Sequence, residues 1–551
     1  MTANEVDVVH AIVREKLKAR FAGREDFSQT ILKADLPRGM GMWGRAAFAL
    51  VVIGTVLFWC RSSSQPLIDQ YSFRQSQTAM TAQWFDFSGP GFGFTAYETP
   101  VLGAPWSVPF EFPLYQAGVA AISRLLALPL IPTGRLLSAA LFLLALLPLH
   151  SITAGLKLRR RTFYIGALLL LCSPFYLYWG RTFLIESTAY FLGFVFLACV
   201  ERSVGKGSWG WLVGAVIAAA GCALVKITTF PSFLGAGMIV AFWRSSNEGL
   251  PVREILLTLA RLLAVGIVAV VLGKLWTDHA DAVKRGSWMG EALTSHGLTS
   301  WNFGTLAQRL NPTLWRQLVW DRVLPESLGS RGIWIFFVVV LAFCRGKQFG
   351  IVAGLVALFF APVLIFFNLH HVHSYYQFAN LFWLILAFGY AFSCWSERVP
   401  WLVWVSVLVC ILGIQWQRFS HSHYYASMQR SDSAALQLAP VIARETSPED
   451  VLLVVGDDWS PELAFHSGRR AIYVPYWVGP AKFDELMDDL RHERRYLGNR
   501  KIKAVILNTD ESSYWKTSYP EIIRRGIRAY IAEQPGVRME RVATYEVYWT
   551  R

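Results

Sequence analysis

The stretch Ile68-Asp69-Gln70-Tyr71-Ser72-Phe73-Arg74-Gln75 follows the first long apolar run, which ends near Cys60. It places a carboxylate and a guanidinium five residues apart at the expected edge of a membrane. A carboxylate there can accept a proton from a hydroxyl group, and an arginine can hold a phosphate through paired hydrogen bonds. Asp69 and Arg74 are therefore the first candidate site residues.

The composition indicates a polytopic membrane protein. Hydrophobic residues make up 54% of the 551 residues and charged residues only 16%, whereas soluble chains are about one quarter charged. The formal net charge of +14 fits basic loops and contact with membrane lipids rather than with nucleic acid. Since the seven cysteines form no CxxC pair, neither a disulfide framework nor a zinc knuckle is expected.

About eleven apolar runs are each long enough to cross, or nearly cross, a bilayer. Before them, residues 1–42 predict an amphipathic helix on the cytoplasmic membrane surface, with a plain solvated helix as the alternative. The runs are Trp43–Cys60, Leu136–Leu156, Phe163–Trp179, Phe183–Val200, Trp209–Val225, Phe230–Trp243, Leu256–Leu275, Gly332–Cys344, Phe349–Phe367, Phe378–Cys394 and Trp401–Trp416.

The run of residues 113–130 decides which loops face outward. If it does not cross, short basic loops such as Lys157–Arg161 and Arg244–Arg253 lie inside, as the positive-inside rule requires. We therefore predict that residues 113–130 lie along the outer leaflet. Residues 61–135 then form a first outer loop with interfacial helices and residues 276–331 a second, both within a transmembrane domain of residues 43–419.

From about residue 420 the composition becomes that of a water-soluble domain. Strand patterns at 451–455, 471–474, 502–507 and 542–549 alternate with helical patterns. Residues 420–551 are therefore predicted to form an α/β domain on the outer side of the membrane.

The predicted topology gathers charged and aromatic side chains at one membrane face. Arginines in separate outer segments suit an anionic lipid headgroup, and the candidates for binding a phosphate are Arg74, Arg135, Arg181 and Lys226. For Arg135 and Lys226 the alternative is snorkelling, and for Arg181 it is a structural pair with Glu186.

The segment 368–376 contains further candidates for hydrogen bonding and stacking with a sugar or phosphate: His371, His373, Tyr375 and Tyr376. His371 and His373 have the spacing of a strand or loop metal site, but no carboxylate or cysteine lies nearby in sequence. We assign no metal ligand, and a divalent metal at these histidines is the alternative.

Several catalytic motifs are missing from the sequence. It contains no GxSxG, Walker loop or HExxH, which argues against a serine hydrolase, a nucleotide-driven pump and a zincin. GxGxxG occurs at Gly39–Gly44 and Gly205–Gly210, but neither follows a strand pattern, so a nucleotide-sugar Rossmann enzyme is not indicated. A membrane enzyme that moves sugars without a nucleotide-binding fold needs a lipid-linked donor.

Four short motifs resemble those of the GT-C fold glycosyltransferases, in particular bacterial relatives of the dolichyl-phosphate-mannose protein mannosyltransferases and of the aminoarabinose lipid A transferases. The resemblance covers residues 43–420. It is carried by Asp69 together with Arg74-Gln75-Ser76-Gln77-Thr78-Ala79, Glu111-Phe112-Pro113-Leu114-Tyr115, Gly134-Arg135-Leu136, and Gly180-Arg181 followed by Glu186.

The resemblance implies a polyprenyl-phosphate-sugar donor and inverting transfer to a glycan, lipid or protein acceptor. Asp69 would be the general base, the cations would hold the lipid phosphate, and Gln75, Glu111 and Glu186 would contact sugar or acceptor hydroxyls. It also implies a bacterial inner membrane protein with its site on the periplasmic side. The family's first motif is often Asp-Glu, where this chain has Asp69-Gln70, and Glu186 replaces a frequent Asp, so the donor and metal dependence stay open.

The alternative function is a transporter or flippase of a lipid-linked sugar. It would need polar residues near mid-membrane and broken helices in paired halves. Arg261 is the one charge well inside a predicted span, and the sequence shows no internal repeat. A non-catalytic scaffold leaves the outer arginines unexplained.

Overall fold

The computed structural model describes residues 42–204 and 209–550. The chain divides into two compact units, Met1–Val52 and Ile53–Arg551. The amphipathic helix predicted for residues 1–42 lies almost entirely outside the described residues. The helix α3 runs from the first unit into the second.

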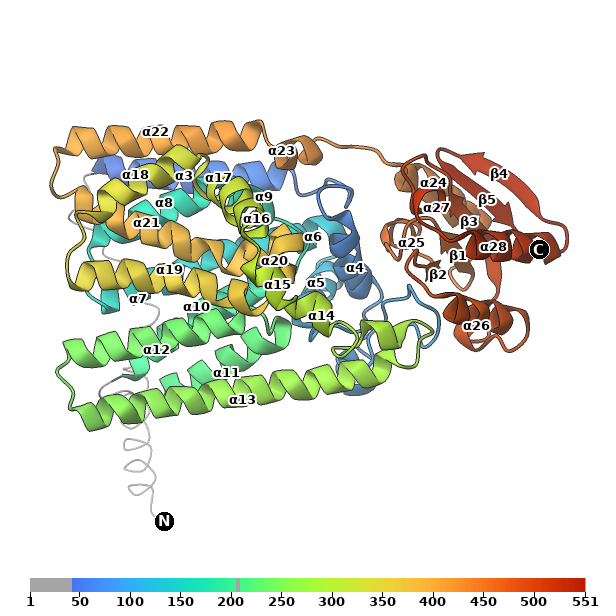
Figure 1. Ribbon diagram of the computed structural model, residues 1–551, viewed down its shortest axis with the longest axis horizontal. Helices are drawn as coiled ribbons and strands as arrows, with labels where there is room; N and C mark the ends of the chain where they lie inside the picture. The colour runs from blue at the N-terminus through green and yellow to red at the C-terminus, as the bar shows by residue number, and fades with distance from the viewer. Residues whose placement is uncertain (1–41, 205–208, 551) are drawn as a thin grey trace, which may run out of the picture. The chain divides into compact units, whose positions relative to one another are not determined.

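The part of the chain before residue 420 is helical, and Figure 1 shows its long helices running alongside one another. The longer helices are α3 (Met42–Arg61), α4 (Ser72–Gln83), α5 (Leu114–Leu125), α6 (Leu130–Leu144), α7 (Leu146–Gly155), α8 (Arg160–Cys172), α10 (Glu186–Ser203), α11 (Trp209–Val225), α12 (Phe230–Asn247), α13 (Val252–Lys284), α18 (Arg331–Leu341), α19 (Lys347–Ile365), α21 (Leu381–Trp395) and α22 (Trp401–Ser420). The shorter helices are η1 (Pro90–Gly93), α9 (Pro174–Trp179), η2 (Gly290–Leu293), α14 (Thr299–Phe303), α15 (Leu306–Leu310), α16 (Pro312–Trp315), η3 (Arg316–Val323), α17 (Leu324–Leu328), α20 (Phe367–Val372) and η4 (Ser374–Ala379). After α22, the short helix α23 (His423–Met428) begins residues 420–551.

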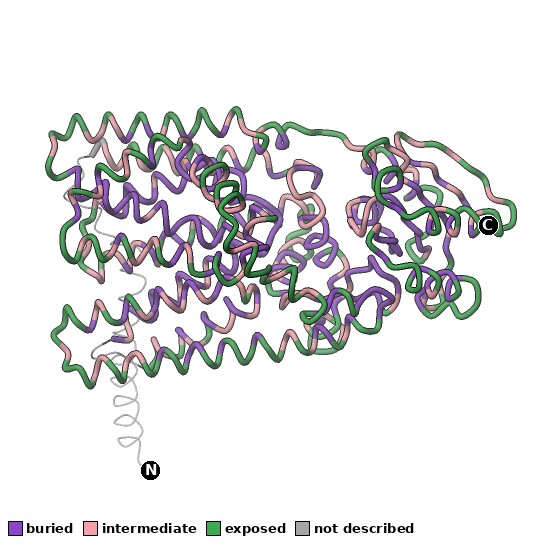
Figure 2. The backbone as a smooth tube through the Cα atoms, viewed as in Figure 1, coloured by how far each residue is buried: buried purple, intermediate pink, exposed green. Residues whose placement is uncertain are grey.

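The helical part has the length and hydropathy of a multi-pass membrane protein. Within the described residues, five helices are long and apolar enough to cross a bilayer, or six if one bent pair counts as a span. Apolar side chains cover the exposed side of α13, among them Leu263, Ile267 and Leu275, and Figure 2 shows α13 and α22 largely exposed while α21 is largely buried. The count of eleven spans stays a prediction, because runs such as α11 and α21 form shorter helices.

Helix lengths bear on both predicted loops: α5 fits the predicted non-crossing run, and α13 revises the start of the second loop. Helix α5 has 12 residues, or about 18 Å, which is too short for a hydrocarbon core of about 30 Å. Its orientation along the outer leaflet stays a prediction. Helix α13 has 33 residues, or about 50 Å, so it continues through Lys284 into the stretch expected to be the second outer loop.

A sharp bend separates α17 from α18. The segments Pro312–Leu328 and Arg331–Leu341 meet at 84°. At the bend, Gly329 has φ of 90°, and a Cβ atom there would lie 2.9 Å from the backbone of Gln415. Ser330 then caps α18, because its side chain accepts a hydrogen bond from the amide of Gly332. Only glycine suits this bend.

Residues 420–551, the C-terminal domain, form a five-stranded sheet with the order β2-β1-β3-β5-β4. Strands β1 to β3 are parallel, and β5 and β4 follow antiparallel. The strands are β1 (Val451–Val455), β2 (Arg470–Val474), β3 (Ile502–Asn508), β4 (Arg538–Val542) and β5 (Tyr545–Trp549). The helices are α24 (Ala434–Glu445), α25 (Glu462–Ser467), α26 (Pro480–Arg491), η5 (Arg495–Leu497), α27 (Tyr514–Thr517) and α28 (Glu521–Glu533).

The stretch predicted to be the first outer loop attaches this domain to the helical part. The amides of Ala471 and Tyr473 donate to the carbonyls of Pro100 and Val101, so the loop pairs with the edge strand β2. Arg470 forms an ion pair of 2.9 Å with Glu98. The C-terminal domain therefore lies against the segment that also contains Asp69 and Arg74.

Candidate functional site

Asp69 lies in a fully buried ion cluster, called here the Asp69 cluster: Asp69, Gln75, Arg135 and Arg181. The Asp69 carboxylate pairs with Arg135 at 3.0 Å and with Arg181 at 2.9 Å, and all three side chains have no exposed surface. Gln75 donates to Asp69 Oδ1 at 2.7 Å and accepts from the amide of Phe183. Buried charges need this kind of compensation, so the cluster ties together three segments that are far apart in sequence.

Local sequence explains how Arg181 reaches Asp69. Arg135 lies in the second turn of α6, directly after Gly134. A Cβ atom on Gly134 would lie 2.1 Å from the Phe183 ring. Glycine therefore lets the turn that follows α9 pack closely against α6, which brings Arg181 beside Arg135.

The carboxylate of Asp69 has four hydrogen bonds. Oδ1 accepts from Gln75 and from Arg135, and Oδ2 accepts from Arg135 and from Arg181. To accept a proton from an acceptor hydroxyl, Asp69 must first release at least one of these bonds.

A second group contains charges of which Arg74, Glu111 and Lys226 are partly exposed. It is called here the Arg74–Lys226 group: Arg74, Glu111, Glu186, Lys226, Tyr375 and Tyr376. Arg74 pairs with Glu111 at 2.8 Å, and these side chains are 17% and 10% exposed. Arg74 also donates to Gln77, while Gln116 donates to the other oxygen of Glu111 at 3.1 Å.

Lys226 is the second cation of this group. It forms a hydrogen-bonded ion pair with Glu186, the first residue of α10. Its ammonium also lies over the rings of Tyr376 and Tyr375, at 4.1 and 5.2 Å from the ring centres. Carboxylate and aromatic faces thus surround a cation that is 9% exposed.

Burial and neighbouring charges shift the pKa values of these residues. Burial lowers the pKa of Lys226 despite the opposing effect of Glu186. For Arg74, burial also acts to lower the pKa, but the carboxylate of Glu111 outweighs it and the pKa is raised. Burial, together with the charges of Arg74 and Lys226, lowers the pKa of His373 to about 4. His373 is therefore neutral at neutral pH.

The two candidate histidines, His371 and His373, lie in different surroundings. The ring of His373 stacks on Tyr375 and packs against Tyr71, beside the Arg74–Lys226 group. His371 instead contacts Gln317 and Phe367. The structure thus brings His373 to the site but places His371 among other residues. Among the described residues, no group of three His, Cys, Asp or Glu side chains has the arrangement of a metal site.

A small cavity that is partly open to solvent adjoins Arg74 and Glu111. Its polar lining includes residues that sequence reasoning missed: Gln77, Thr78, Thr81, Tyr97, Thr99 and Gln116. Asp69 is not among the residues that line it. Helix α4 carries a polar stripe at helical spacing, formed by Arg74, Gln77, Thr78 and Thr81. This pattern could have identified these residues as site candidates from the sequence.

Phe110 connects this cavity to two other parts of the chain. The ammonium of Lys284, at the end of α13, lies 4.8 Å from the Phe110 ring centre. Trp459 of the C-terminal domain lies 6.0 Å from the same ring and 4.9 Å from Phe73. No short motif in the sequence indicates Lys284 or Trp459.

No protein-family model and no curated protein sequence matches the chain. Solved structures do. A crystal structure of ArnT from Cupriavidus metallidurans bound to undecaprenyl phosphate has a TM-score of 0.60 at 15% identity, covering 91% of this chain and 97% of that chain. The apo state of the same ArnT has a TM-score of 0.52 at 14% identity, covering 92% and 98%.

A structure of the arabinofuranosyltransferase AftD from Mycobacteria also matches, with a TM-score of 0.50 at 15% identity, covering 92% of this chain and 41% of that chain. ArnT and AftD are GT-C fold glycosyltransferases. At these identities the likeness concerns the fold. The chain therefore has the GT-C fold that its sequence motifs predicted.

Proposed function

We propose that this protein is a membrane glycosyltransferase that moves a sugar from a polyprenyl-phosphate-linked donor to an acceptor hydroxyl. The observation that carries the proposal is the convergence of four cations from distant segments, with their carboxylate partners, in a GT-C fold. The ArnT structure with the same fold holds undecaprenyl phosphate. The sugar and the acceptor, whether glycan, lipid or protein, are left open.

The donor phosphate binds Arg74 and Lys226 in this proposal. Both are partly exposed, whereas Arg135 and Arg181 have no exposed surface. An incoming phosphate can replace Glu111 and Glu186 as the partner of these cations, since a charge-assisted hydrogen bond to either anion has similar strength. Arg135 and Arg181 do not contact the phosphate in this proposal. They stabilise the site by holding Asp69 and the segment that leads into α4.

Transfer needs a base and a stabilised leaving group. The base takes the proton of the acceptor hydroxyl, the oxygen attacks the anomeric carbon, and the bond from that carbon to the phosphate oxygen breaks. The phosphate leaves with the bonding electron pair, and Arg74 and Lys226 stabilise its charge. A single displacement inverts the anomeric configuration.

Two carboxylates are candidates for the base. Asp69 matches the family motif, but it must release Arg135, Arg181 or Gln75 before it can act. Glu111 lines the cavity and is held by Arg74 and Gln116, so a substrate that engages Arg74 frees it directly. Tyr375, Tyr376 and His373 provide stacking faces and hydroxyl groups for sugar rings, and Glu186 completes the proposed sugar and acceptor contacts. Gln75 is buried and bonded to Asp69, so it would reach a substrate only if the Asp69 cluster opens.

The catalytic face is proposed to be periplasmic, in a bacterial inner membrane. The C-terminal domain lies on the same side, because it contacts the first outer loop directly. Its Trp459 lies beside Phe110, so the domain borders the site.

The test uses the purified full chain in vesicles made from membrane lipids of its native host. Mass spectrometry follows glycosylated polyprenyl phosphates and free polyprenyl phosphate. The proposal predicts that one glycosylated lipid disappears while an equal amount of free polyprenyl phosphate is formed. Since the bent pair α17–α18 is also a feature of transporters, movement of the intact lipid across the bilayer without conversion would instead support the flippase alternative.

A further inference from the structure

The parallel strands of the C-terminal domain bring three loops to one edge of the sheet. Strand β1 lies between β2 and β3, so the chain passes from β1 to its neighbour on one side and then returns to the neighbour on the other. In open α/β sheets, the carboxyl ends of the strands at such a reversal are the common position of a ligand site. The side chains on the three loops that leave these ends are therefore candidates for ligand contact.

Aromatic side chains occupy all three loops. Trp459 follows β1, Tyr476 and Trp477 follow β2, and Tyr514 follows β3. These four side chains are called here the aromatic row. The rings of Tyr476 and Tyr514 stack with their centres 4.3 Å apart and their planes 9° from parallel. Trp477 and Tyr514 are 39% and 40% exposed, so their rings are available to a partner.

The aromatic row begins at the candidate site. The ring centre of Trp459 lies 6.0 Å from that of Phe110, which lines the cavity of the Arg74–Lys226 group. Asp458, the neighbour of Trp459 in sequence, is hydrogen-bonded to the side chain of Trp477. A series of contacts thus runs from the cavity to the exposed rings of the C-terminal domain.

The side chains of the aromatic row suit a carbohydrate. Tyrosine and tryptophan combine an apolar ring face with a polar group at the ring edge. A sugar ring packs its C–H groups on such a face, while its hydroxyls form hydrogen bonds beside it. Within the described part of the chain, the hydroxyls of Tyr476 and Tyr514 form no hydrogen bond, so both are available to a sugar.

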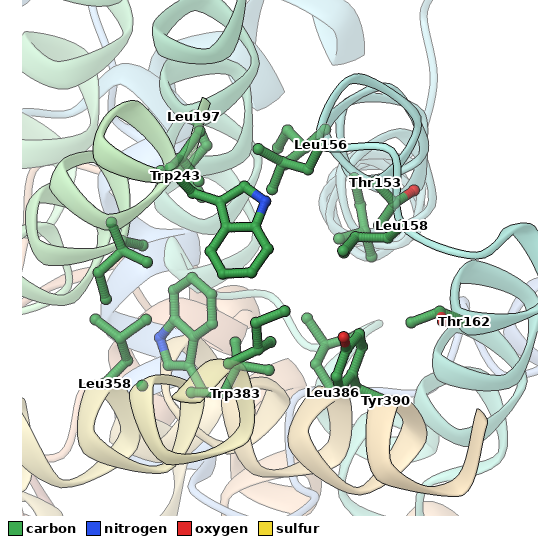
Figure 3. A pocket seen from close by; sticks show the side chains of 18 of the residues that line it. Thr153, Leu156, Leu158, Thr162, Leu197, Trp243, Leu358, Trp383, Leu386 and Tyr390 are labelled. Carbon is green, nitrogen blue, oxygen red and sulfur yellow. The ribbon is translucent and has the colours of Figure 1, made fainter. Parts of the chain in front are cut away.

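A cavity between α7, α8, α10, α12, α19 and α21 differs from the aromatic row in this respect. Its lining is almost entirely apolar (Figure 3), with side chains such as Leu156, Leu197 and Leu358. Such walls offer few partners to a hydroxyl group, and sugar hydroxyls that lose water need such partners. We therefore assign no sugar to this cavity.

We propose that the aromatic row binds the acceptor and that the acceptor is a glycan of several sugar units. The inference rests on the proposed function, because it takes the cavity beside Arg74 and Glu111 as the place where the acceptor hydroxyl meets the donor. The sugar that carries this hydroxyl lies at the cavity and against Trp459, and further units stack on Trp477 and Tyr514. A peptide or an acyl chain has no series of sugar-ring faces to match the row.

Glycan binding to the purified full chain in detergent, without donor, tests the proposal. The probes are oligosaccharides released by mild acid from the cell envelope of the native host, separated by length and labelled with a fluorescent dye. Fluorescence anisotropy measures their affinity. Trp477→Ala and Tyr514→Ala each remove an exposed ring, and Trp477→Phe keeps a ring face. Met539→Ala is the matched control, since Met539 is 57% exposed on β4, at the opposite edge of the sheet from β2.

Fractions with several sugar units are expected to bind the unchanged chain and Met539→Ala equally. They should bind Trp477→Ala and Tyr514→Ala about tenfold more weakly, and Trp477→Phe nearly as well as the unchanged chain. Absence of binding by every fraction would overturn the proposal, and so would equal affinity for the unchanged chain and both alanine variants.

The proposed function fails in a different way. Glycan binding with the expected variant pattern, but without conversion of a glycosylated polyprenyl phosphate, would contradict glycosyl transfer and leave the glycan site in place. Conversion of the lipid by a chain that binds none of the glycan fractions would contradict the glycan site alone.

Discussion

The Asp69 cluster and the Arg74–Lys226 group contain the same kinds of side chain but differ in burial. Asp69, Arg135 and Arg181 have no exposed surface, whereas Arg74, Glu111 and Lys226 are 17%, 10% and 9% exposed. A fully buried pair is costly to open because each partner would be left as an unpaired charge. A partly exposed pair can exchange partners. We therefore infer that the Asp69 cluster mainly maintains the shape of the site and that the Arg74–Lys226 group contacts the substrate.

The largest effect is expected from removing one arginine of the buried cluster. Arg181→Ala leaves the Asp69 carboxylate short of a buried partner, and such changes cost about 3–5 kcal/mol. Thermal unfolding of the full chain in detergent should show a clear loss of stability, and Arg74→Ala a smaller one. Equal losses for both variants would remove the distinction between the two groups.

The next effect concerns transfer rather than stability. Glu111→Gln keeps the size of this side chain and one of its two acceptor oxygens but removes its negative charge. Loss of a general base typically costs about 10²–10⁴-fold in rate. Donor consumption should fall by that factor while the unfolding temperature changes little. Asp69→Asn is the companion variant. If a stable Asp69→Asn protein loses transfer completely while Glu111→Gln stays active, the general base is Asp69 and not Glu111.

Asp458, in the C-terminal domain, is a carboxylate that forms no ion pair with another described residue. Burial raises its pKa to about 6, and its Oδ1 atom has no hydrogen-bond partner within the described chain. Because this folded-state pKa lies above the unfolded value, the protonated form stabilises the fold at low pH, and that stabilisation is lost as pH rises through about 6. Asp458→Asn should therefore raise the free energy of unfolding by about 1–2 kcal/mol at pH 8 but not at pH 4. A stabilisation that does not vary with pH would contradict this assignment.

The smallest expected effect is at His373. Because burial and the charges of Arg74 and Lys226 hold its pKa at about 4, it should not titrate between about pH 5.5 and 8. The pH–rate profiles of the unchanged chain and of His373→Asn should have the same shape over that range. A change of rate near pH 6.5 that is present in the unchanged chain and absent in His373→Asn would show that His373 becomes charged during the reaction.

The sequence predicted the C-terminal domain well where burial is uniform. Val451–Val455 is buried throughout, as expected for the centre of a parallel sheet, and the predicted strand has the same bounds. The predicted strand at 542–549 is instead part of a hairpin of β4 and β5. Ala543 makes the turn with φ of 52°, and without Gly, Asn or Asp at this position the usual hairpin signal is missing.

For the candidate site, topology predicted which segments converge but not which side chains are accessible. Asp69 and Glu111 are both acids in the predicted first outer loop. Only the packing of α4 against α6 and the turn at Arg181 decides that Asp69 is enclosed and that Glu111 lines a cavity. Gln116 and Tyr97 carry no charge, so the charge pattern did not identify them. Trp459 reaches the site from the C-terminal domain, a contact that no local pattern contains.

We propose that a lipid phosphate binds the Arg74–Lys226 group. The most direct measurement is the affinity of the full chain for undecaprenyl phosphate, from the rise in unfolding temperature as the lipid is added. Arg74→Gln and Lys226→Gln are each expected to weaken binding by about tenfold, while Arg331→Gln, whose ion pair with Asp321 is on another part of the surface, leaves it unchanged. Unchanged affinity in both Arg74→Gln and Lys226→Gln would contradict the claim.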